Sequence, residues 1–261
     1  MNTLKKIINP LIINLGKRKE SKHFPEAPVI IGACPRSGTT ILLSILDAHP
    51  KIFGIPNQTY AFDRWREIKD KDSEQITDYP YRLDRLYREL LIRKIPPTAH
   101  RWLEKTPKHI RSFSRILNYF DNRVKLINIV RDGRDVVTSK HPKHNPDQYW
   151  VSVKRWVSDV SIGLSFKDHP SVISIRYEDL IAGFESTMLR IYTFLGEEPP
   201  ENLTDWIKQT NIRKSIHLGK PVRNLYTDSI ARWQKPEHKK RLDEFMANER
   251  AMELLKEFNY I

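Results

Sequence analysis

Cysteine is almost absent from this 261-residue sequence: Cys34 stands alone, which excludes an internal disulfide framework and favours a reducing compartment. No apolar run approaches the roughly 20 residues that a membrane-spanning helix needs. Internal repeats and low-complexity tracts are also missing. The chain is long enough for one sizeable α/β domain with a full core, and a cytoplasmic protein is the expectation.

Acidic residues are in the minority, since 45 lysines and arginines face 32 aspartates and glutamates and leave a net charge of +13. Such a charge suits an anionic partner, which includes a nucleotide, a nucleic acid, an acidic sugar and a membrane surface, but a solvated basic surface gives the same number. We find no nucleic-acid-binding module and no basic-aromatic repeat. A nucleic-acid partner is therefore not predicted.

The first 27 residues are interpreted as a lead-in to a domain that spans 28–261. Their short apolar core is flanked by lysines and lacks a small-residue cleavage site, so we do not predict a signal peptide. A flexible or locally docked segment is the favoured interpretation. A helix at a membrane interface is the alternative, because apolar side chains fall at helical spacing among the basic residues: Leu4, Ile8, Leu11, Ile12 and Leu15.

Strand-like and helix-like segments alternate along the rest of the chain. Continuous apolar runs in "PVIIGAC", "VKLINIV" and "SVISIRY" predict three buried strands. Helical spacing follows each of them, in Thr39–Asp47, from about Arg134, and in "FESTMLRIYTFLG". This alternation predicts an α/β fold of one domain, with a parallel sheet covered by helices on both faces, and ligands of such sheets bind at the carboxyl ends of the strands.

Four further helices are expected. Thr106 is suited to cap a helix that begins at Pro107, and "YRLDRLYRELLIRK" places its leucines on one face. Apolar spacing from Trp150 to Leu164 predicts a third helix, and the charged stretch "EHKKRLDEFMANERAMELLKEF" predicts a fourth.

The stretch "IIGACPRSGTT" joins the first strand to its helix through a loop with Gly32 and Gly38. Backbone amides of such a loop point at an anion, and the following helix adds the positive end of its dipole. Thr39 and Thr40 supply hydroxyls, and Arg36 supplies charge. A Walker loop has four residues between its glycines and then a lysine, whereas this loop has five residues and then Thr39, so a Mg–triphosphate site is not reproduced. An ordinary strand-to-helix turn is the alternative.

A second basic site follows the strand in "LINIVRDGRDVVTSKH". Arg131 stands at the end of the strand, and Ser139 follows eight residues later, about two helical turns on. An arginine makes a bidentate, charge-assisted contact with a phosphate, and a hydroxyl on the helix completes a clamp. A structural salt bridge from Arg131 to Asp132 or Asp135 is an equally good interpretation.

These motifs together resemble a known family. "PRSGTT" followed by "LDAHP" is similar to the 5′-phosphosulfate loop and first helix of sulfotransferases that use 3′-phosphoadenosine 5′-phosphosulfate (PAPS), especially the tyrosylprotein and bacterial branches. "VRDGRDVVTS" resembles the 3′-phosphate motif of that family, and "EKTP" and "RYEDL" fall in the same order. The resemblance runs from about Val29 to Trp233 and implies a P-loop-type α/β sheet.

The resemblance also implies roles for the matching residues. Arg131, Ser139 and Lys143 match contacts to the 3′-phosphate, and Tyr177 matches a tyrosine near the nucleotide. Lys220 in "GKPV" belongs to a C-terminal segment, with Arg232-Trp233, that closes over the cofactor. The 5′-phosphosulfate would be held by the first loop: Pro35, Arg36, Ser37, Gly38, Thr39 and Thr40. Strand-end packing is the alternative for Tyr177, and a solvated loop position is the alternative for Lys220.

Lys105 in "LEKTP" matches the catalytic lysine of the family, whose ammonium reaches the bridging oxygen of the leaving group. Arg36 is expected to stabilise the same charge, and sulfuryl transfer of this kind requires no metal. The alternative for Lys105 is a pair with Glu104 at the end of a strand.

The general base is where this sequence departs from the family. The glutamate of the family aligns with Gln58 in "NQTYAF", and glutamine cannot accept a proton. His109, four residues after Lys105, is the candidate base because its ordinary pKa is near neutral, while a histidine that only packs or hydrogen-bonds is the alternative. Asp63 and His141 are further candidates. An amine or a low-pKa hydroxyl as acceptor would need no strong base.

Sulfuryl transfer from PAPS to a hydroxyl or an amine is the leading prediction. One alternative is a non-catalytic relic of the family that binds the 3′,5′-bisphosphate nucleotide, and Gln58 motivates it. A P-loop kinase is another, which the missing Walker lysine disfavours. The acceptor is left open among small molecules, sugars, lipids and protein tyrosines, and peripheral contact with a membrane is left open too.

Overall fold

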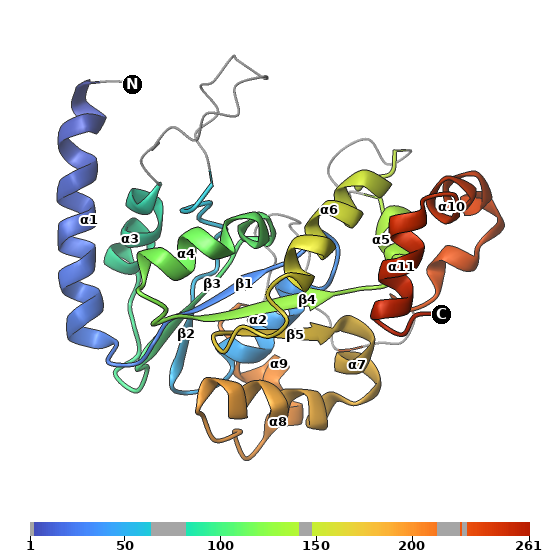
Figure 1. Ribbon diagram of the computed structural model, residues 1–261. Coiled ribbons are helices and arrows are strands. Elements are labelled where there is room, and N and C mark those ends of the chain that lie inside the picture. The colour runs from blue at the N-terminus through green and yellow to red at the C-terminus, as the bar shows by residue number, and fades with distance from the viewer. Residues whose placement is uncertain (1–2, 64–81, 141–147, 213–224, 226–228) are drawn as a thin grey trace.

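The computed structural model describes residues 3–63, 82–140, 148–212, 225 and 229–261. Within these residues, one sheet of parallel strands in the order β2-β3-β1-β4-β5 forms the centre of the molecule, with helices on both faces (Figure 1). The strands are β1 Val29–Gly32, β2 Ile52–Gly54, β3 Arg101–Lys105, β4 Lys125–Val130 and β5 Val172–Arg176. The predicted P-loop-type α/β architecture is confirmed.

Two of these strands, β2 and β3, were not predicted from the sequence. β2 has only three residues, and β3 reads as charged because it contains Arg101, Glu104 and Lys105. All five residues of β3 are nevertheless buried. Their charges have partners within the protein, as when Nε of Arg101 lies 2.8 Å from Oε1 of Glu197. Pairing of this kind lets charged residues occupy an interior strand that a hydrophobic pattern does not reveal.

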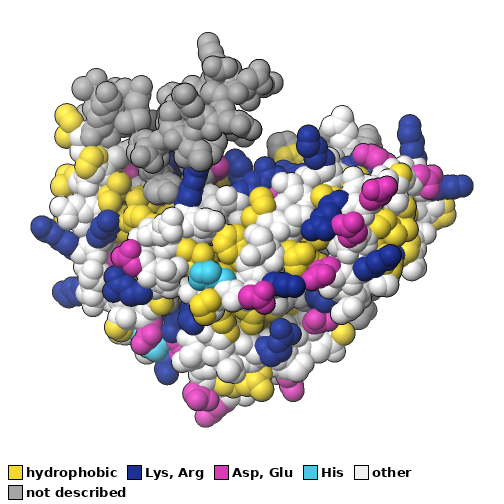
Figure 2. Space-filling model, viewed as in Figure 1, with side chains coloured by type: hydrophobic (Ala, Val, Ile, Leu, Met, Phe, Trp, Pro, Cys, Tyr) yellow, Lys and Arg dark blue, Asp and Glu magenta, His cyan; other side chains and the backbone are white. Residues whose placement is uncertain are grey.

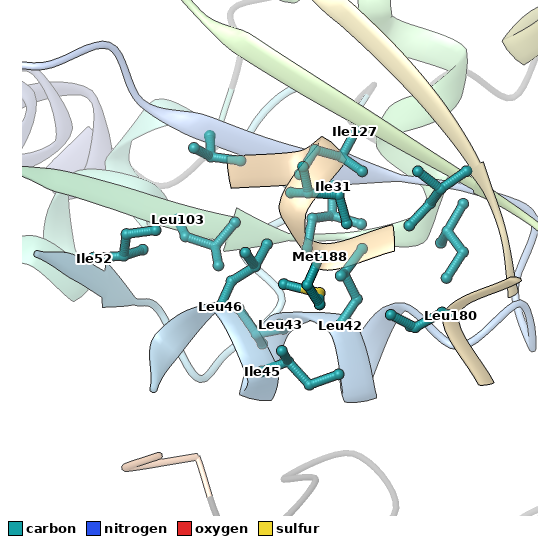
Figure 3. Packing of buried hydrophobic residues seen from close by; sticks show 14 of the residues in the cluster. Ile31, Leu42, Leu43, Ile45, Leu46, Ile52, Leu103, Ile127, Leu180 and Met188 are labelled. Carbon is teal, nitrogen blue, oxygen red and sulfur yellow. The ribbon is translucent and has the colours of Figure 1, made fainter. Parts of the chain in front are cut away.

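Side chains of the central strands alternate between two cores. Ile31, Leu103 and Ile127 face α2 (Thr39–Asp47) and α8 (Phe184–Leu195), as the packing in Figure 3 shows. Their neighbours Ile30, Trp102 and Leu126 face the opposite core, which includes α3 (Leu83–Ile92) and α4 (Phe113–Tyr119). This period of two follows from the pleat of a strand, and it explains why each strand reads as continuously apolar.

A third core lies beyond the carboxyl end of β4. It joins α5 (Gly133–Val137) and α6 (Val153–Leu164) to the C-terminal helices. The single helix expected at the C-terminus is in fact two, α10 (Lys239–Met246) and α11 (Glu249–Glu257). Asn248 separates them because its Oδ1 accepts a hydrogen bond of 2.9 Å from the backbone N–H of Ala251 and so caps α11.

Helix starts differ from the sequence prediction at two further places. Trp150 lies before α6, whose cap is Ser152, and the Ser152 side chain accepts from the backbone N–H of Arg155. Thr106 does not cap the helix at Pro107, because its hydroxyl donates to Glu104 instead. Pro107–Ser112 form a 3₁₀ turn, η1, which leads into α4. The remaining short elements are α7 Tyr177–Ala182, η2 Leu203–Asp205, α9 Trp206–Gln209, η4 Arg232–Gln234 and η5 Pro236–His238.

The N-terminal segment forms a long helix, α1 (Thr3–His23), that packs along α3 at one edge of the molecule (Figure 1). Gly16 permits the close approach, because a Cβ there would meet the Cβ of Tyr87 at 2.3 Å. The ammonium of Lys19 donates to the backbone carbonyls of Leu91 and Arg93 at the C-terminal end of α3, where the helix dipole favours a cation. The segment is therefore docked. Among the residues described, no helix is both long and apolar enough to cross a membrane.

Candidate functional site

The loop between β1 and α2 has the backbone conformation of an anion cradle. Arg36 and Gly38 both adopt positive φ values, 74° and 93°, which turn the chain sharply before α2 begins. A Cβ at Gly38 would meet the Tyr177 ring at 2.4 Å, so only glycine allows the loop and the end of β5 to approach so closely. The N-terminus of α2, with the positive end of its dipole, therefore opens directly onto this loop.

Ser37 is an unusual residue at the centre of the loop. It is fully buried, and its hydroxyl oxygen has no hydrogen-bond partner among the described residues. A buried hydroxyl without a partner is costly, and such a group in a native structure calls for an explanation. An oxyanion seated in the loop supplies the missing partner, so the residues present fit a phosphate-like group.

Lys105 reaches the same loop from the neighbouring strand. Parallel pairing of β1 with β3 places it beside Ile31, and its ammonium donates to Oγ1 of Thr40 at 3.2 Å. Its side chain is buried, and burial lowers the pKa of Lys105 to about 8, which the charge of Glu104 only partly offsets. A desolvated ammonium at a loop that fits an anion is poised to stabilise negative charge there.

Glu104, the residue before it, has the opposite environment. Its Oε1 accepts from the backbone N–H of Thr59 at 3.0 Å, from the Thr59 hydroxyl at 3.0 Å and from the Thr106 hydroxyl at 2.6 Å. Its Oε2 lies 2.9 Å from Nδ1 of His109. Burial opposes ionisation of the Glu104 carboxyl, but the adjacent His109 and these hydrogen bonds outweigh it and hold the pKa below its usual range. Sequence reasoning named Glu104 only as a possible partner of Lys105 and did not expect these contacts.

His109 uses both ring nitrogens inside the protein. Nδ1 faces Glu104, and Nε2 lies 3.3 Å from the backbone N of Phe62, which donates to it. The side chain is also buried. With Nε2 accepting from Phe62, the ring proton is assigned to Nδ1, and both nitrogens lie against groups of the protein. This geometry corresponds to the structural alternative that the sequence left open for His109.

The loop that contains Gln58 is held by hydrogen bonds to the Glu104 carboxylate. Gln58 itself is half-buried, and the next residue, Thr59, donates twice to Glu104. Tyr60 follows with a positive φ of 53°, and its backbone N–H donates to the Thr106 hydroxyl. Asp63, another candidate base, lies 2.7 Å from the ammonium of Lys108. His141 falls outside the described residues.

Arg131 lies directly after β4, where the sequence predicts a phosphate contact. Its Nη1 donates to the carbonyl of Arg36 at 3.0 Å, so it joins the first loop to the second motif. The guanidinium carbon stands 4.9 Å from the centre of the Tyr177 ring. One Nη donates to the carbonyl of Ser229 and lies 3.5 Å from Asp135, while Nε is buried without a partner among the described residues. Arg131 therefore forms the structural salt bridge to Asp135, and it also keeps a donor that could contact a phosphate.

Asp135 ties the C-terminal segment to this motif. It accepts from the backbone N–H groups of Ala231 and Trp233 at 3.0 Å each. Burial raises the pKa of the Asp135 carboxyl, and Arg131 and these N–H groups partly offset that effect. The Tyr177 hydroxyl lies 2.7 Å from Oγ of Ser229. Residues 229–233 therefore pack against the end of β4 and the start of α7, an arrangement that sequence reasoning expected only by analogy.

Ser139 lies just beyond α5, which is shorter than the two turns expected from the sequence. Its hydroxyl donates to the carbonyl of Val136 at 2.8 Å, and the residue is half-exposed. Lys143 and Lys220, predicted to contact the nucleotide, lie outside the described residues.

Among the predicted site residues that the structure describes, it brings together the first loop, Lys105, Arg131 and Tyr177.

The chain is thus an α/β protein in which the loop at Gly38 and the arginine after β4 meet at the carboxyl ends of the strands and form a candidate anion site. The profile of the sulfotransferase family matches residues 28–201. The chain belongs to the sulfotransferase family.

Curated relatives support this placement over part of their length. Protein-tyrosine sulfotransferase 1 of Homo sapiens is 30% identical over 140 residues, which cover 49% of this chain and 37% of that protein. Protein-tyrosine sulfotransferase 2 of Gallus gallus is 28% identical over 200 residues, which cover 68% of this chain and 53% of that protein. The chain spans roughly a third to a half of the length of these relatives.

Solved structures show the same fold. A mouse sulfotransferase complexed with PAP superposes with a TM-score of 0.57 at 18% identity, covering 94% of this chain and 93% of that one. The sulfotransferase domain of the Synechococcus olefin synthase gives a TM-score of 0.56 at 19% identity, covering 87% and 96%. At these identities the likeness speaks for architecture alone.

Proposed function

We propose that this protein transfers a sulfuryl group from PAPS to a hydroxyl or an amine of an acceptor. The observation that carries the proposal is the buried Ser37 hydroxyl, which has no hydrogen-bond partner among the residues described, in a loop whose Thr40 also accepts from the Lys105 ammonium. Family membership and the mouse structure with PAP support the same donor. PAPS supplies an activated sulfonate whose leaving group is a phosphate.

The first loop is assigned to the 5′-phosphosulfate. Backbone amides from Pro35 to Thr40 and the Ser37 hydroxyl would hold its oxygens, and Arg36 would add charge. Lys105, kept dry by burial and oriented by Thr40, would neutralise the charge that develops on the leaving oxygen as the sulfur bond breaks. Sulfuryl transfer depends mostly on such positioning and charge stabilisation.

The second motif is assigned to the nucleotide's 3′-phosphate. Arg131 has a buried Nε without a partner among the described residues, and its link to the Arg36 carbonyl couples the two phosphate positions. Ser139 and Lys143 would complete this contact, while Tyr177 and Lys220 would border the nucleotide. These assignments extend from the sequence resemblance and from the placement of Arg131 and Tyr177.

His109 is assigned a positioning role rather than proton transfer. It holds Glu104, and Glu104 holds the Thr59 backbone next to Gln58. With Gln58 at the family's glutamate position, we infer an acceptor that needs no strong base, such as an amine or a low-pKa hydroxyl. Removal of His109 by His109→Ala should then disturb folding stability more than the pH profile of turnover. Loss of the low-pH limb, where turnover rises as a base loses its proton, would restore the general-base role.

Calorimetry with 3′-phosphoadenosine 5′-phosphate tests the donor site directly. Wild-type protein should bind it more tightly than AMP or ATP with Mg²⁺, and Arg131→Ala should abolish that preference. Arg190→Ala, an exposed arginine on α8, is the matched control and should bind as the wild type does. Preference for ATP, or indifference to the 3′-phosphate, would overturn the assignment.

A nucleotide-binding relic of the family is the second candidate, and Gln58 is the observation that favours it. It predicts the same binding data but no sulfuryl transfer to any acceptor. Screening ³⁵S-labelled PAPS against amines, phenols, sugars and lipids distinguishes the two. A cytoplasmic location also remains a proposal, based on the single cysteine, Cys34.

A further inference from the structure

Helix α1 carries two apolar faces, although only one of them packs on the protein. Ile12 and Ile13 lie against the core that includes α3. On the outer side, Ile7, Leu11 and Leu15 follow one another at four-residue spacing and are 70%, 58% and 44% exposed. Residues four apart lie on one face of a helix, so these three form a continuous stripe. A surface helix with one packed side needs only one apolar face, which leaves the outer stripe unexplained by the fold.

The charge on this helix is almost entirely positive. The first 23 residues contain six lysines and arginines but a single acidic residue, Glu20. Glu20 points inward, where its carboxylate accepts from Trp102 Nε1 at 2.7 Å and from the Tyr87 hydroxyl at 3.0 Å. It therefore offers no negative charge on the outer side of the helix.

The stripe continues into basic residues along the same face. Arg18 and Lys22 follow Leu11 by seven and eleven residues, a spacing that keeps them on one side of a helix, and both are exposed. Figure 2 shows hydrophobic side chains along the upper part of the α1 edge and Lys and Arg side chains below them. We call Ile7, Leu11, Leu15, Arg18 and Lys22 the outer face of α1.

We propose that the outer face of α1 binds the surface of an anionic lipid membrane, with the helix lying in the plane of the interface. The apolar stripe would enter the boundary between headgroups and acyl chains, and Arg18 and Lys22 would contact anionic headgroups. Packing of the opposite side on α3 fixes which face is presented. A second copy of the chain fits less well, because two such faces carry charge of the same sign and offer each other no acidic partner. None of the residues assigned to the donor site belongs to this face.

Flotation with lipid vesicles tests the apolar half of the face. Wild-type protein should float with phosphatidylcholine vesicles that contain about a third phosphatidylglycerol. The triple variant Ile7→Ser, Leu11→Ser, Leu15→Ser should lower the partition coefficient on the order of 10²-fold, because three large side chains lose their contact with the acyl region. Leu189→Ser is the matched control, since Leu189 is 53% exposed on α8, and it should float as the wild type does.

A second variant tests the basic half without touching the apolar stripe. Arg18→Gln with Lys22→Gln should weaken binding about 30-fold, and phosphatidylcholine alone should bind the wild type far less well than the anionic mixture. Absence of flotation, or flotation that the triple variant retains, overturns the proposal. A wild-type dimer in light scattering that the triple variant makes monomeric would assign the face to a second copy instead.

Binding of 3′-phosphoadenosine 5′-phosphate separates this inference from the proposed function. Both α1 variants should bind the nucleotide with wild-type affinity, which also shows that they are folded. If a variant loses membrane binding but still binds the nucleotide, the result concerns α1 alone. If the wild type floats with vesicles but does not bind the nucleotide, the membrane proposal stands and the donor assignment is overturned.

Discussion

Glu104 and Lys105 are neighbours at the end of β3, and both are buried, but their surroundings differ. The Glu104 carboxylate has four partners: the Thr59 backbone, the hydroxyls of Thr59 and Thr106, and His109. The Lys105 ammonium has three donors, and among the described residues its one hydrogen bond goes to Thr40. A buried charge with all its partners supplied by the protein holds the structure together, whereas one with spare donors is available to a ligand.

The same contrast recurs between two serines near α2. The Ser44 hydroxyl is buried and donates toward the carbonyls of Thr40 and Ile212, both at 3.1 Å. The Ser37 hydroxyl is equally buried but has no partner among the described residues. Burial alone therefore does not distinguish the two serines, whereas the presence or absence of a hydrogen-bond partner does.

Of the substitutions proposed here, Glu104→Ala should lower the free energy of unfolding the most. Removing the carboxylate leaves His109, Thr59 and Thr106 buried without their partner, and each buried polar group left unsatisfied costs about 1–3 kcal/mol. Urea denaturation should show this loss in the free energy of unfolding. Glu201→Ala, at an exposed position, is the control and should change it little. A stability near that of the wild type would contradict the structural role of Glu104.

Lys105→Ala should show the reverse pattern. We expect turnover to fall on the order of 10²–10³, as it does when a preorganised charge donor is removed. The free energy of unfolding should stay level or rise, because a desolvated cation is lost. Steady-state kinetics and urea denaturation on the same preparation check both halves, with Lys256→Ala on α11 as an exposed control. Near wild-type turnover would remove Lys105 from the chemistry.

Titration of Lys105 should change both the stability of the protein and its kcat/KM as the pH is raised. Burial lowers its pKa from 10.5 to about 8, so the folded protein loses this proton near pH 8 and the unfolded chain keeps it until about 10.5. Because the unfolded chain binds more protons in that window, the contribution of Lys105 to stability rises with pH there, while kcat/KM falls as the ammonium is lost. Lys105→Met should abolish the rise in stability. A kcat/KM that stays flat above pH 8 would contradict the assignment.

Ser37→Ala and Ser44→Ala form the most delicate comparison. Removing the Ser37 hydroxyl, which has no partner in the described part of the chain, should leave stability unchanged or raise it slightly, whereas removing the bonded Ser44 hydroxyl should lower it by about 1 kcal/mol. Affinity for 3′-phosphoadenosine 5′-phosphate should drop for Ser37→Ala only. Thermal unfolding and calorimetry on the pair measure both. Equal destabilisation by the two substitutions would mean that Ser37 has a structural partner.

Local pattern was enough to predict much of the fold. The strands β1, β4 and β5 read as apolar runs because they are buried on both faces, and α8 ends at Gly196, which adopts a φ of 72°. β3 escaped detection because three of its five residues are charged, and their pairing depends on distant residues such as Glu197. The break at Asn248 was missed because the helical pattern continues through it on both sides.

The sequence by itself determined where the candidate anion site lies: a glycine turn after one strand and Arg131 after another meet at one edge, because parallel strands end together. Tertiary structure alone decided which of the buried polar groups have partners. His109 meets Phe62 across 47 positions, and Asp135 meets Trp233 across 98. It also decided that α1 turns Gly16 toward α3 and leaves Leu11 in solvent. The periodicity of the sequence indicates that a helix has apolar faces, but only packing against the rest of the protein decides which face is buried.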